Sequence, residues 1–278
     1  MTGFDLTAYL DRLGLDPVPV TAQGLRDLQR AQLRALPFEA IDPYLGRLPD
    51  LDMAAIRDKV LHRGRGGYCF ELNALLHAAL IALGFDSRRR LARVRKGAPE
   101  GGPRSHLMME VTLPEGVFLV DAGYGGPGAL TPLRLDTGAE QPAPNGTYRL
   151  WHDDKTGERV LDKQTEAEWF PLYGFDDAHV GKADIEAANF ICAHWEAMPF
   201  PNHLMLAGFD GETRIGVFDR AVTREDANGI EKTTLDDPEA LSRLTHELGL
   251  RLDTPTLHRI WSRLTREGPS DKDRSPPG

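Results

Sequence analysis

The sequence predicts an α+β fold: helices fill roughly the first 85 residues, strands follow in the middle of the chain, and helices return near its end. Two observations lead to this prediction. Apolar residues recur at three- and four-residue spacing in the first part, and from about residue 91 they alternate with polar residues. No internal repeat or long linker separates the parts, so we expect them to pack as one body.

Three short helices are expected first. One covers residues 6–13, one follows a predicted N-cap at Thr21, and one follows Asp52. Pro37 and Pro43 mark the break between the second and the third.

The fourth helix has the clearest pattern. Its leucine and alanine residues at 72–83 follow the i, i+3, i+4, i+7 spacing of a buried face. Gly84 is well placed to end it, and its start is expected at Cys69 or within a residue or two. A glycine-bearing loop therefore leads directly into a long buried helix.

Alternating segments predict five strands in the middle of the chain, at residues 91–95, 106–113, 117–121, 148–151 and 159–161. The turn Pro114-Glu115-Gly116 joins the second and third of them into a hairpin. We expect a small antiparallel sheet or barrel.

The last third returns to mixed structure. A helix is expected at residues 184–195, then a hairpin over Asp210-Gly211 and a turn at Asn228-Gly229. Two helices follow, with Pro238 and Pro255 each at the first helical position. The final dozen residues are rich in Pro, Ser, Asp and Lys and are expected to be disordered.

Composition excludes several classes of protein. The two cysteines of the 278-residue chain cannot form a disulfide framework or a four-cysteine zinc site, and we expect no metal. The longest apolar stretch is too short to cross a bilayer, and the N-terminus lacks a signal-peptide pattern. We therefore expect a cytoplasmic protein without a membrane partner.

Charge is unevenly distributed. The net charge of −9 argues against a nucleic-acid partner, yet eleven Lys or Arg oppose four Asp or Glu between residues 57 and 104. This excess suits either attraction of an anionic, phosphate-bearing cofactor or a solvated strand edge. Charge alone favours the strand edge.

Cys69 is the candidate nucleophile. The glycine-bearing loop at residues 63–68 delivers it to a helix start, where free backbone N–H groups and the helix dipole favour a thiolate. An N–H at or beside Cys69 is also placed to stabilise an oxyanion. Cys192 lies in the middle of a predicted helix, and we interpret it as a structural residue.

A thiol nucleophile needs a base, and His106 is the best of nine histidines. His62 precedes the glycine loop and His77 lies two turns along the helix, so both are poorly placed. His106 begins a strand, and Asp121 ends the hairpin partner of that strand. The carboxylate is thus expected to orient the imidazole ring.

Several segments resemble one known family. The run Arg-Gly-Gly-Tyr-Cys-Phe-Glu-Leu-Asn at 65–73 resembles the active-site signature of the arylamine N-acetyltransferases. Ser-His-Leu-Met at 105–108 resembles the histidine segment of that family, and Leu-Val-Asp-Ala-Gly-Tyr-Gly-Gly at 119–126 its aspartate segment. Leu-Pro-Phe-Glu at 36–39 also resembles the family, and the match covers nearly the whole chain in order and size.

The resemblance implies a three-part architecture. Residues 1–85 would form a helical bundle carrying the catalytic cysteine, residues 86–190 a β-barrel carrying the histidine and aspartate, and residues 191–278 an α/β lid. The three catalytic groups would be arranged as in papain or transglutaminase.

The resemblance also implies a ping-pong reaction. Acetyl-CoA would acetylate Cys69, CoA would leave, and an arylamine, arylhydrazine or arylhydroxylamine would take the acetyl group. His106 would shuttle the proton and Asp121 would hold the imidazole.

Binding residues follow from the same resemblance. Phe38 and Tyr124 fall where the family lines its acceptor pocket, and Gly123, Gly125 and Gly126 fall where a backbone loop would approach the pyrophosphate of CoA. The segment at 190–206 departs from the expected serine- and threonine-rich lid, which leaves lid contacts to CoA open. Arg65 is expected to pair with Glu39 or Glu71 beneath the cysteine loop.

Three other functions remain open at this point. The same triad serves cysteine hydrolases and protein-crosslinking enzymes. An amide synthase using a longer acyl chain is a variant within the family. A binding protein without catalysis would use the basic middle region to hold an anionic partner.

Overall fold

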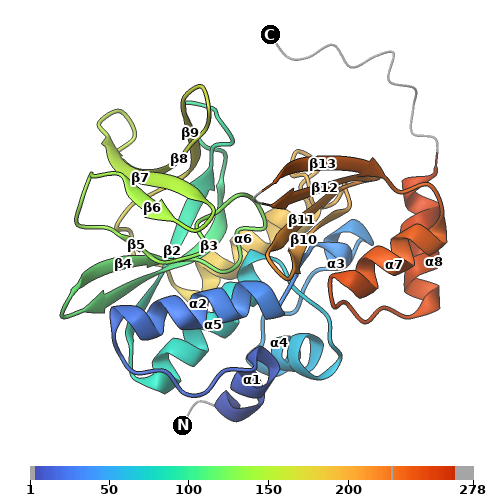
Figure 1. Cartoon of the computed structure of the whole chain (residues 1–278), viewed down its shortest axis with the longest axis horizontal. Helices are drawn as coiled ribbons and strands as arrows, with labels where there is room; N and C mark the ends of the chain where they lie inside the picture. Colours follow the sequence, from blue (N-terminus) through green and yellow to red (C-terminus); the bar gives the residue numbers. More distant parts are fainter. Residues whose placement is uncertain (1–3, 227, 267–278) are drawn as a thin grey trace.

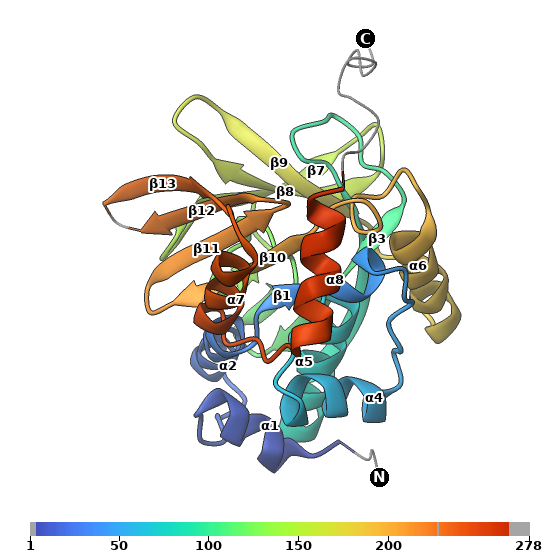
Figure 2. The ribbon, with the colours of Figure 1, turned by 90° about the vertical axis from the view of Figure 1, so that its right-hand side faces the viewer.

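Two antiparallel sheets lie above a layer of N-terminal helices in the computed structural model, which describes residues 4–226 and 228–266 (Figures 1 and 2). The α+β class is confirmed. The helices of the described residues are α1 (Leu6–Leu13), α2 (Ala22–Ala35), α3 (Ile41–Tyr44), α4 (Met53–Arg57), α5 (Cys69–Leu83), α6 (Lys182–His194), α7 (Pro238–Glu247) and α8 (Thr254–Leu264).

The N-terminal helices begin where the sequence predicts. Thr21 caps α2 by accepting a hydrogen bond from the backbone N–H of Gly24. Helix α4 starts after Asp52 and continues into a π-helical turn, η1 (Asp58–His62). Helix α5 starts at Cys69 and ends at Gly84, whose φ of 95° is a left-handed conformation suited to glycine.

The larger sheet has eight strands and is barrel-like, in the order β5-β4-β3-β2-β9-β8-β7-β6. Its strands are β2 (Asp86–Val94), β3 (Arg104–Leu113), β4 (Gly116–Val120), β5 (Leu133–Arg134), β6 (Gln141–Ala143), β7 (Gly146–Asp153), β8 (Glu158–Gln164) and β9 (Trp169–Phe175). All five predicted strands are present. Asp121 lies one residue beyond β4, and the unpredicted β9 pairs with β2 and β8.

The smaller sheet has five strands in the order β1-β10-β11-β12-β13. They are β1 (Phe38–Glu39), β10 (Met205–Asp210), β11 (Thr213–Phe218), β12 (Ala221–Asp226) and β13 (Gly229–Thr234). The predicted hairpin over Asp210-Gly211 joins β10 to β11. Phe38 pairs with Ala207, so this sheet takes in a strand from the N-terminal part of the chain.

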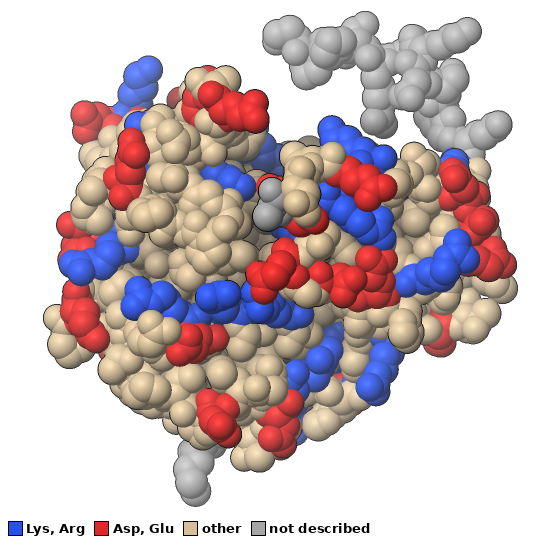
Figure 3. Space-filling model, viewed as in Figure 1, with Lys and Arg blue, Asp and Glu red and all other residues tan. Residues whose placement is uncertain are grey.

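The expectation of a solvated strand edge for the basic segment is wrong. Strand β2 is an interior strand, because β3 and β9 flank it. Its Arg90 is buried against Glu110, and Arg95, just beyond its end, is buried against Asp153 and Glu158. On the face shown in Figure 3, acidic and basic side chains are interspersed, with a band of basic ones over α2.

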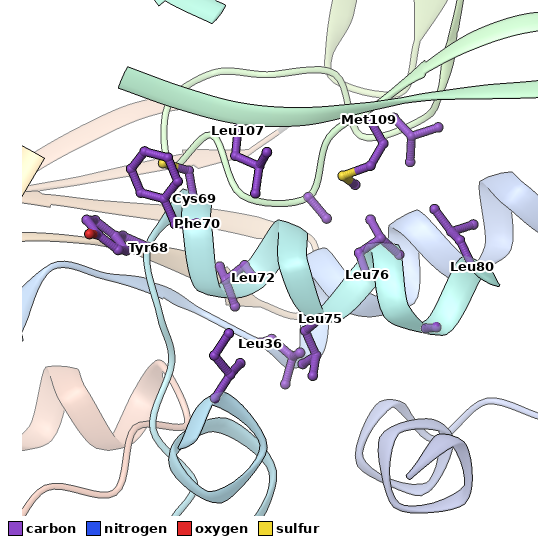
Figure 4. Packing of buried hydrophobic residues seen from close by; sticks show 14 of the residues in the cluster. Leu36, Tyr68, Cys69, Phe70, Leu72, Leu75, Leu76, Leu80, Leu107 and Met109 are labelled. Atoms are coloured by element: carbon purple, nitrogen blue, oxygen red, sulfur yellow. The ribbon is translucent and has the colours of Figure 1, made fainter. Parts of the chain in front are cut away.

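Helix α5 is the centre of the largest core cluster. Figure 4 shows Leu72 directed toward Leu36 and Leu76 toward Met109 of β3, with Cys69 at the start of the helix. Since its leucines are buried on several sides, α5 is held as a rigid element between the N-terminal helices and the larger sheet. The residue at its start is therefore fixed in position.

The C-terminal helices confirm one predicted start and correct the other. Asp237 accepts the N–H of Ala240 and Pro238 is the first residue of α7. In α8 the cap is Asp253, which accepts the N–H of Thr256, so Pro255 is the second helical residue and not the first.

The described residues do not test two of the expectations. The expected disorder of the final dozen residues lies outside the described residues. The division into 1–85, 86–190 and 191–278 stays a prediction. Within the described ranges, no helix has the length and apolar character that a membrane crossing requires.

Candidate active site

The structure brings Cys69, His106 and Asp121 together. Cys69 is the first residue of α5, His106 lies in β3, and Asp121 follows the end of the neighbouring strand β4. His106 Nε2 lies 2.6 Å from Asp121 Oδ2. The Cys69 thiol lies close enough to His106 for each group to shift the pKa of the other. All three side chains are buried.

A dense set of hydrogen bonds fixes the Asp121 carboxylate. Asn73 Nδ2 donates to Oδ1 at 2.9 Å, the Gly123 N–H donates to Oδ1 at 3.0 Å, and the Tyr173 hydroxyl donates to Oδ2 at 3.0 Å. Asn73 Oδ1 in turn accepts the N–H of Ala122 at 3.0 Å. The carboxylate is therefore held in one orientation toward the imidazole.

Sequence reasoning did not assign Asn73 or Tyr173 to the site. Asn73 had a detectable signal, because it is a polar residue in an apolar helix four positions after Cys69, hence on the same face one turn later. Tyr173 had none, since its strand, β9, was not predicted. Gln29 of α2 is also part of the site, because its Oε1 accepts the N–H of Asp121 at 3.2 Å.

The pKa values of the three groups are coupled. Burial alone would lower the pKa of His106, but the charge and hydrogen bond of Asp121 together with the thiol raise it to about 10. Burial raises the pKa of the Cys69 thiol, and His106 opposes this rise. Burial would also raise the pKa of Asp121, yet His106 and Asn73 hold it below its usual value. The site thus favours an imidazolium paired with a carboxylate.

The loop before Cys69 rests on a buried ion cluster. Arg65 pairs with Glu39 at 2.6 Å, which is one of the two predicted pairs, and Lys59 pairs with Glu71 at 2.8 Å and with Asp42 at 2.7 Å. Burial alone would lower the pKa of Lys59, but the three carboxylates raise it. Burial raises the pKa of Glu71 to about 7, as expected where three carboxyl groups share two cations.

Glu71 connects this cluster to the nucleophile. Its Oε2 accepts the N–H of Tyr68 at 3.1 Å, directly before Cys69, while its Oε1 accepts from Lys59. The Tyr68 hydroxyl donates to Asn189 of α6. Tyr68, the residue before the thiol, is thus held by Glu71 through its backbone and by Asn189 through its side chain.

A cavity of about 590 Å³ opens over the thiol. Phe38, Tyr124, Gly125 and Gly126 lie in its wall together with Cys69 and His106. Gly123 is not among the lining residues. It lies against α5 instead, where an added Cβ would be 2.7 Å from Asn73 Nδ2 and 3.0 Å from Cys69 Cα. The predicted binding roles of these glycines and aromatics stay predictions.

Comparison with known proteins agrees with this geometry. Residues 21–257 match the family model described as N-acetyltransferase. A curated arylamine N-acetyltransferase of Mycobacterium tuberculosis is 37% identical over 259 residues, which cover 89% of this chain and 90% of the relative. The chain belongs to the arylamine N-acetyltransferase family.

Two further family members are informative. A Salmonella typhimurium protein named arylamine N-acetyltransferase / N-hydroxyarylamine O-acetyltransferase is 38% identical over 208 residues, covering 74% of this chain and 73% of its own. The structure of the Mycobacterium marinum arylamine N-acetyltransferase in complex with CoA superimposes with a TM-score of 0.85 at 33% identity, covering 94% of this chain and 98% of that one.

In this family member, the segment after α6 closes one side of the cavity. Trp195, Met198, Pro199 and Phe200 contribute to its wall, which is largely apolar. Phe200 contacts both Phe38 and Tyr68 through ring packing. The serine- and threonine-rich stretch that the resemblance led us to expect is thus replaced by apolar and aromatic side chains.

Cys192 is a buried residue of α6, as its mid-helix position predicted, but it also lies close to the triad. Its Sγ is 3.4 Å from the carbonyl oxygen of Ser105, and Cys69 Sγ is 3.7 Å from the same oxygen. Burial raises the pKa of Cys192 to about 12, so this thiol is poorly suited to act as a nucleophile.

No cluster of three or more His, Cys, Asp or Glu side chains that could hold a metal ion occurs among the residues with described positions.

Proposed function

We propose that this protein transfers an acetyl group from acetyl-CoA to an aromatic amine, hydrazine or hydroxylamine through an acetyl-thioester on Cys69. The observation that carries the proposal is a buried thiol at a helix start, beside a histidine whose ring is fixed by Asp121, in the wall of an apolar cavity. The names of the curated relatives support the choice of donor and acceptor.

The first half-reaction forms the acetyl-enzyme. The sulfur of Cys69 attacks the carbonyl carbon of the thioester, a new carbon–sulfur bond forms, and the bond to the CoA sulfur breaks. The proton of Cys69 resides on His106 in the reactive thiolate–imidazolium pair, and His106 gives it to the departing CoA thiolate. The high pKa of His106 keeps the proton on the imidazole between these steps. The backbone N–H groups at the start of α5 are suited to stabilise the oxyanion.

The second half-reaction frees the enzyme. The nitrogen of the acceptor attacks the acetyl carbon, His106 receives the proton lost by that nitrogen, and Cys69 leaves as the thiolate, which restores the thiolate–imidazolium pair. The apolar wall disfavours water, because few polar groups are available to orient it. Transfer to an amine is therefore favoured over hydrolysis.

The remaining roles belong to the same proposal. Phe38 and Tyr124 provide apolar and edge-on aromatic surfaces for the acceptor ring, with the Tyr124 and His106 rings 5.2 Å apart. Gly125 and Gly126 leave room for the phosphate-bearing part of CoA, while Gly123 secures the approach of the Asp121 segment to α5. The triad is arranged as in papain, residues after 190 serve as the lid, and the protein works in the cytoplasm.

The decisive assay is CoA release from acetyl-CoA with and without an aromatic amine or hydrazide. We expect one rapid equivalent of CoA without acceptor and sustained release with it, and Cys69→Ser should abolish both phases. Sustained release that ignores the acceptor would identify a hydrolase. Cleavage of a peptide or crosslinking of a protein amine would overturn the proposal.

A further inference from the structure

One charged residue in the cavity wall has no role in the chemistry proposed above. Lys96 follows the end of β2 and lines the cavity that contains Cys69 and His106. Of the lining residues with described positions, none is Asp or Glu, and Lys96 is the sole Lys or Arg. The neighbouring wall is apolar, with Phe170 and Leu172 close by in β9.

The contrast with the preceding residue is informative. The guanidinium of Arg95 is buried, and its two terminal nitrogens bind Asp153, Glu158 and the carbonyl of Pro99. For the ammonium of Lys96, the described ranges of the chain provide neither a hydrogen bond nor an ion pair. The two neighbouring basic residues therefore differ: Arg95 is neutralised by buried carboxylates, whereas Lys96 lines a cavity and has no counterion among the described residues.

The backbone at Lys96 is strained, and its position is firmly held. Its φ is 49°, in the left-handed region that costs a residue with a side chain about 1–2 kcal/mol. Backbone hydrogen bonds from Arg95 N to Leu172 O at 2.8 Å and from Gly97 N to Pro171 O at 2.9 Å anchor this turn to β9. The turn therefore sets where the Lys96 side chain starts.

The other non-glycine residue with positive φ in the described chain has a structural reason for it. Asp219 has a φ of 53°, and its carboxylate binds His203 and the N–H of Leu204. The side chain of Lys96 makes no comparable bond. Strained residues that close no internal contact are frequent at ligand-binding positions.

The electrostatics of the cavity point the same way. Partial removal from water lowers the pKa of Lys96, and no carboxylate opposes that effect. Lys96 is solvent-exposed at the edge of the cavity, and an anionic group entering the cavity would supply its counterion beside an apolar wall.

We propose that Lys96 is a specificity-determining residue that binds an anionic group of the substrate occupying the cavity above Cys69. The group is a carboxylate, sulfonate or phosphate, and two substrates can carry it: an aromatic acceptor with an acidic substituent, or the donor through a phosphate of CoA. The inference rests on the proposed acetyl transfer for the identity of these substrates.

The test compares Lys96→Met with the unchanged protein, with Lys96→Arg as the conservative variant. Lys155→Met serves as the matched control, because Lys155 is an exposed lysine in the turn between β7 and β8 and does not line the cavity. Two acceptors of equal shape, 4-aminobenzoate and 4-aminobenzamide, differ in charge. Two donors, acetyl-CoA and S-acetylpantetheine, differ in their phosphates.

We expect Lys96→Met to lower kcat/KM about tenfold or more for one charged substrate only, the usual range for a hydrogen bond to a charged group. A loss confined to 4-aminobenzoate assigns the anion to the acceptor. Slower acetylation of Cys69 by acetyl-CoA, with S-acetylpantetheine unaffected, assigns it to the donor. Lys96→Arg should keep most of the preference. Equal rates for Lys96→Met and Lys155→Met with every substrate would overturn the proposal.

Failure of the proposed function gives a different result. If the unchanged protein transfers acetyl from neither donor, acetyl transfer is refuted, and the role of Lys96 is then read from binding alone. Calorimetric titration with 4-aminobenzoate and with CoA should show about tenfold weaker binding to Lys96→Met for one of these anions, with 4-aminobenzamide unchanged. Equal affinities in both proteins would overturn the role of Lys96.

Discussion

Replacing Gly123 by alanine is expected to disrupt the site without touching a catalytic side chain. The added Cβ would lie 2.7 Å from Asn73 Nδ2, 3.0 Å from Asn73 Cγ and 3.0 Å from Cys69 Cα. The last of these is backbone at the start of α5 and cannot turn away, so the segment carrying Asp121 has to shift. Overpacking of this kind costs about 1–3 kcal/mol, and loss of the hydrogen bond from Asn73 to Asp121 adds about 1 kcal/mol.

The expected result is lower stability together with lower activity. A loss of about 2–4 kcal/mol lowers the Tm of a chain of this size by roughly 5–15 °C. Because the shift separates Asp121 and its histidine partner from the thiol, acetyl transfer should fall about 10²-fold. Thermal denaturation followed by circular dichroism and the CoA-release assay measure the two effects.

Gly128 provides the matched control. Neither glycine has a positive φ, and a Cβ on Gly128 would meet nothing nearer than 3.4 Å, an ordinary contact with the Tyr124 ring. Gly128→Ala should therefore retain both Tm and rate. If Gly123→Ala behaves like Gly128→Ala in both assays, the argument that close packing of this segment on α5 positions the triad is refuted.

Three further predictions follow from charges and burial. His106 should stay protonated through neutral pH, and its imidazole signals in NMR spectra should titrate near pH 10. The midpoint of this titration should be lower in Asp121→Asn. A midpoint at or below pH 6.5 in the unchanged protein would contradict the ion pair between His106 and Asp121. The pKa of His106 is higher in the folded state than in the unfolded state. His106 therefore contributes fully to the free energy of unfolding below about pH 6.5, and this contribution is lost as the pH rises toward 10. Lys59→Met should lower the free energy of unfolding by about 3–5 kcal/mol in urea titrations, because Glu71 loses its buried partner. Adding Glu71→Gln to this variant should restore part of the lost stability. An unchanged urea midpoint in Lys59→Met would show that the ion cluster does not stabilise the loop before Cys69. Cys192→Ala should acetylate at the wild-type rate in rapid-quench experiments, whereas a loss above tenfold would give that thiol a role in the chemistry.

Local sequence signals were sufficient to predict the elements that carry the triad. The start of α5 could be placed at Cys69 because a glycine-bearing loop meets a strongly periodic apolar run there. His106 and Asp121 could be paired because a three-residue turn implies a hairpin, which places the two residues on neighbouring strands. These predictions depend on residues close together in the sequence.

Contacts between distant segments were beyond the reach of the sequence pattern. Strand β9 contains Pro171 and Gly174, both unfavourable in strands, and Pro171 lies where the register of the β8–β9 pairing shifts. Without β9, neither Tyr173 nor the interior position of β2 could be foreseen. The hydrogen bond between the Gln29 side chain and the backbone N–H of Asp121 joins residues 92 positions apart, and no local sequence pattern predicts it.

Burial also changes the expected state of the nucleophile. The helix start at Cys69 led us to expect a favoured thiolate, but the thiol is 3% exposed and its pKa is raised. The helix dipole acts on any residue at that position, whereas burial depends on how β3 and α6 close over it. His106 is therefore more important for generating the thiolate than the sequence alone suggested.

The most direct test of the central claim is mass spectrometry of the protein quenched rapidly after mixing with acetyl-CoA alone. We predict one added acetyl group, located on the peptide that contains Cys69, and its disappearance when an aromatic amine is added before the quench. The same adduct should be missing from His106→Ala. An unmodified Cys69 during sustained acetyl transfer, or an acetyl group found only on another residue, would contradict the account.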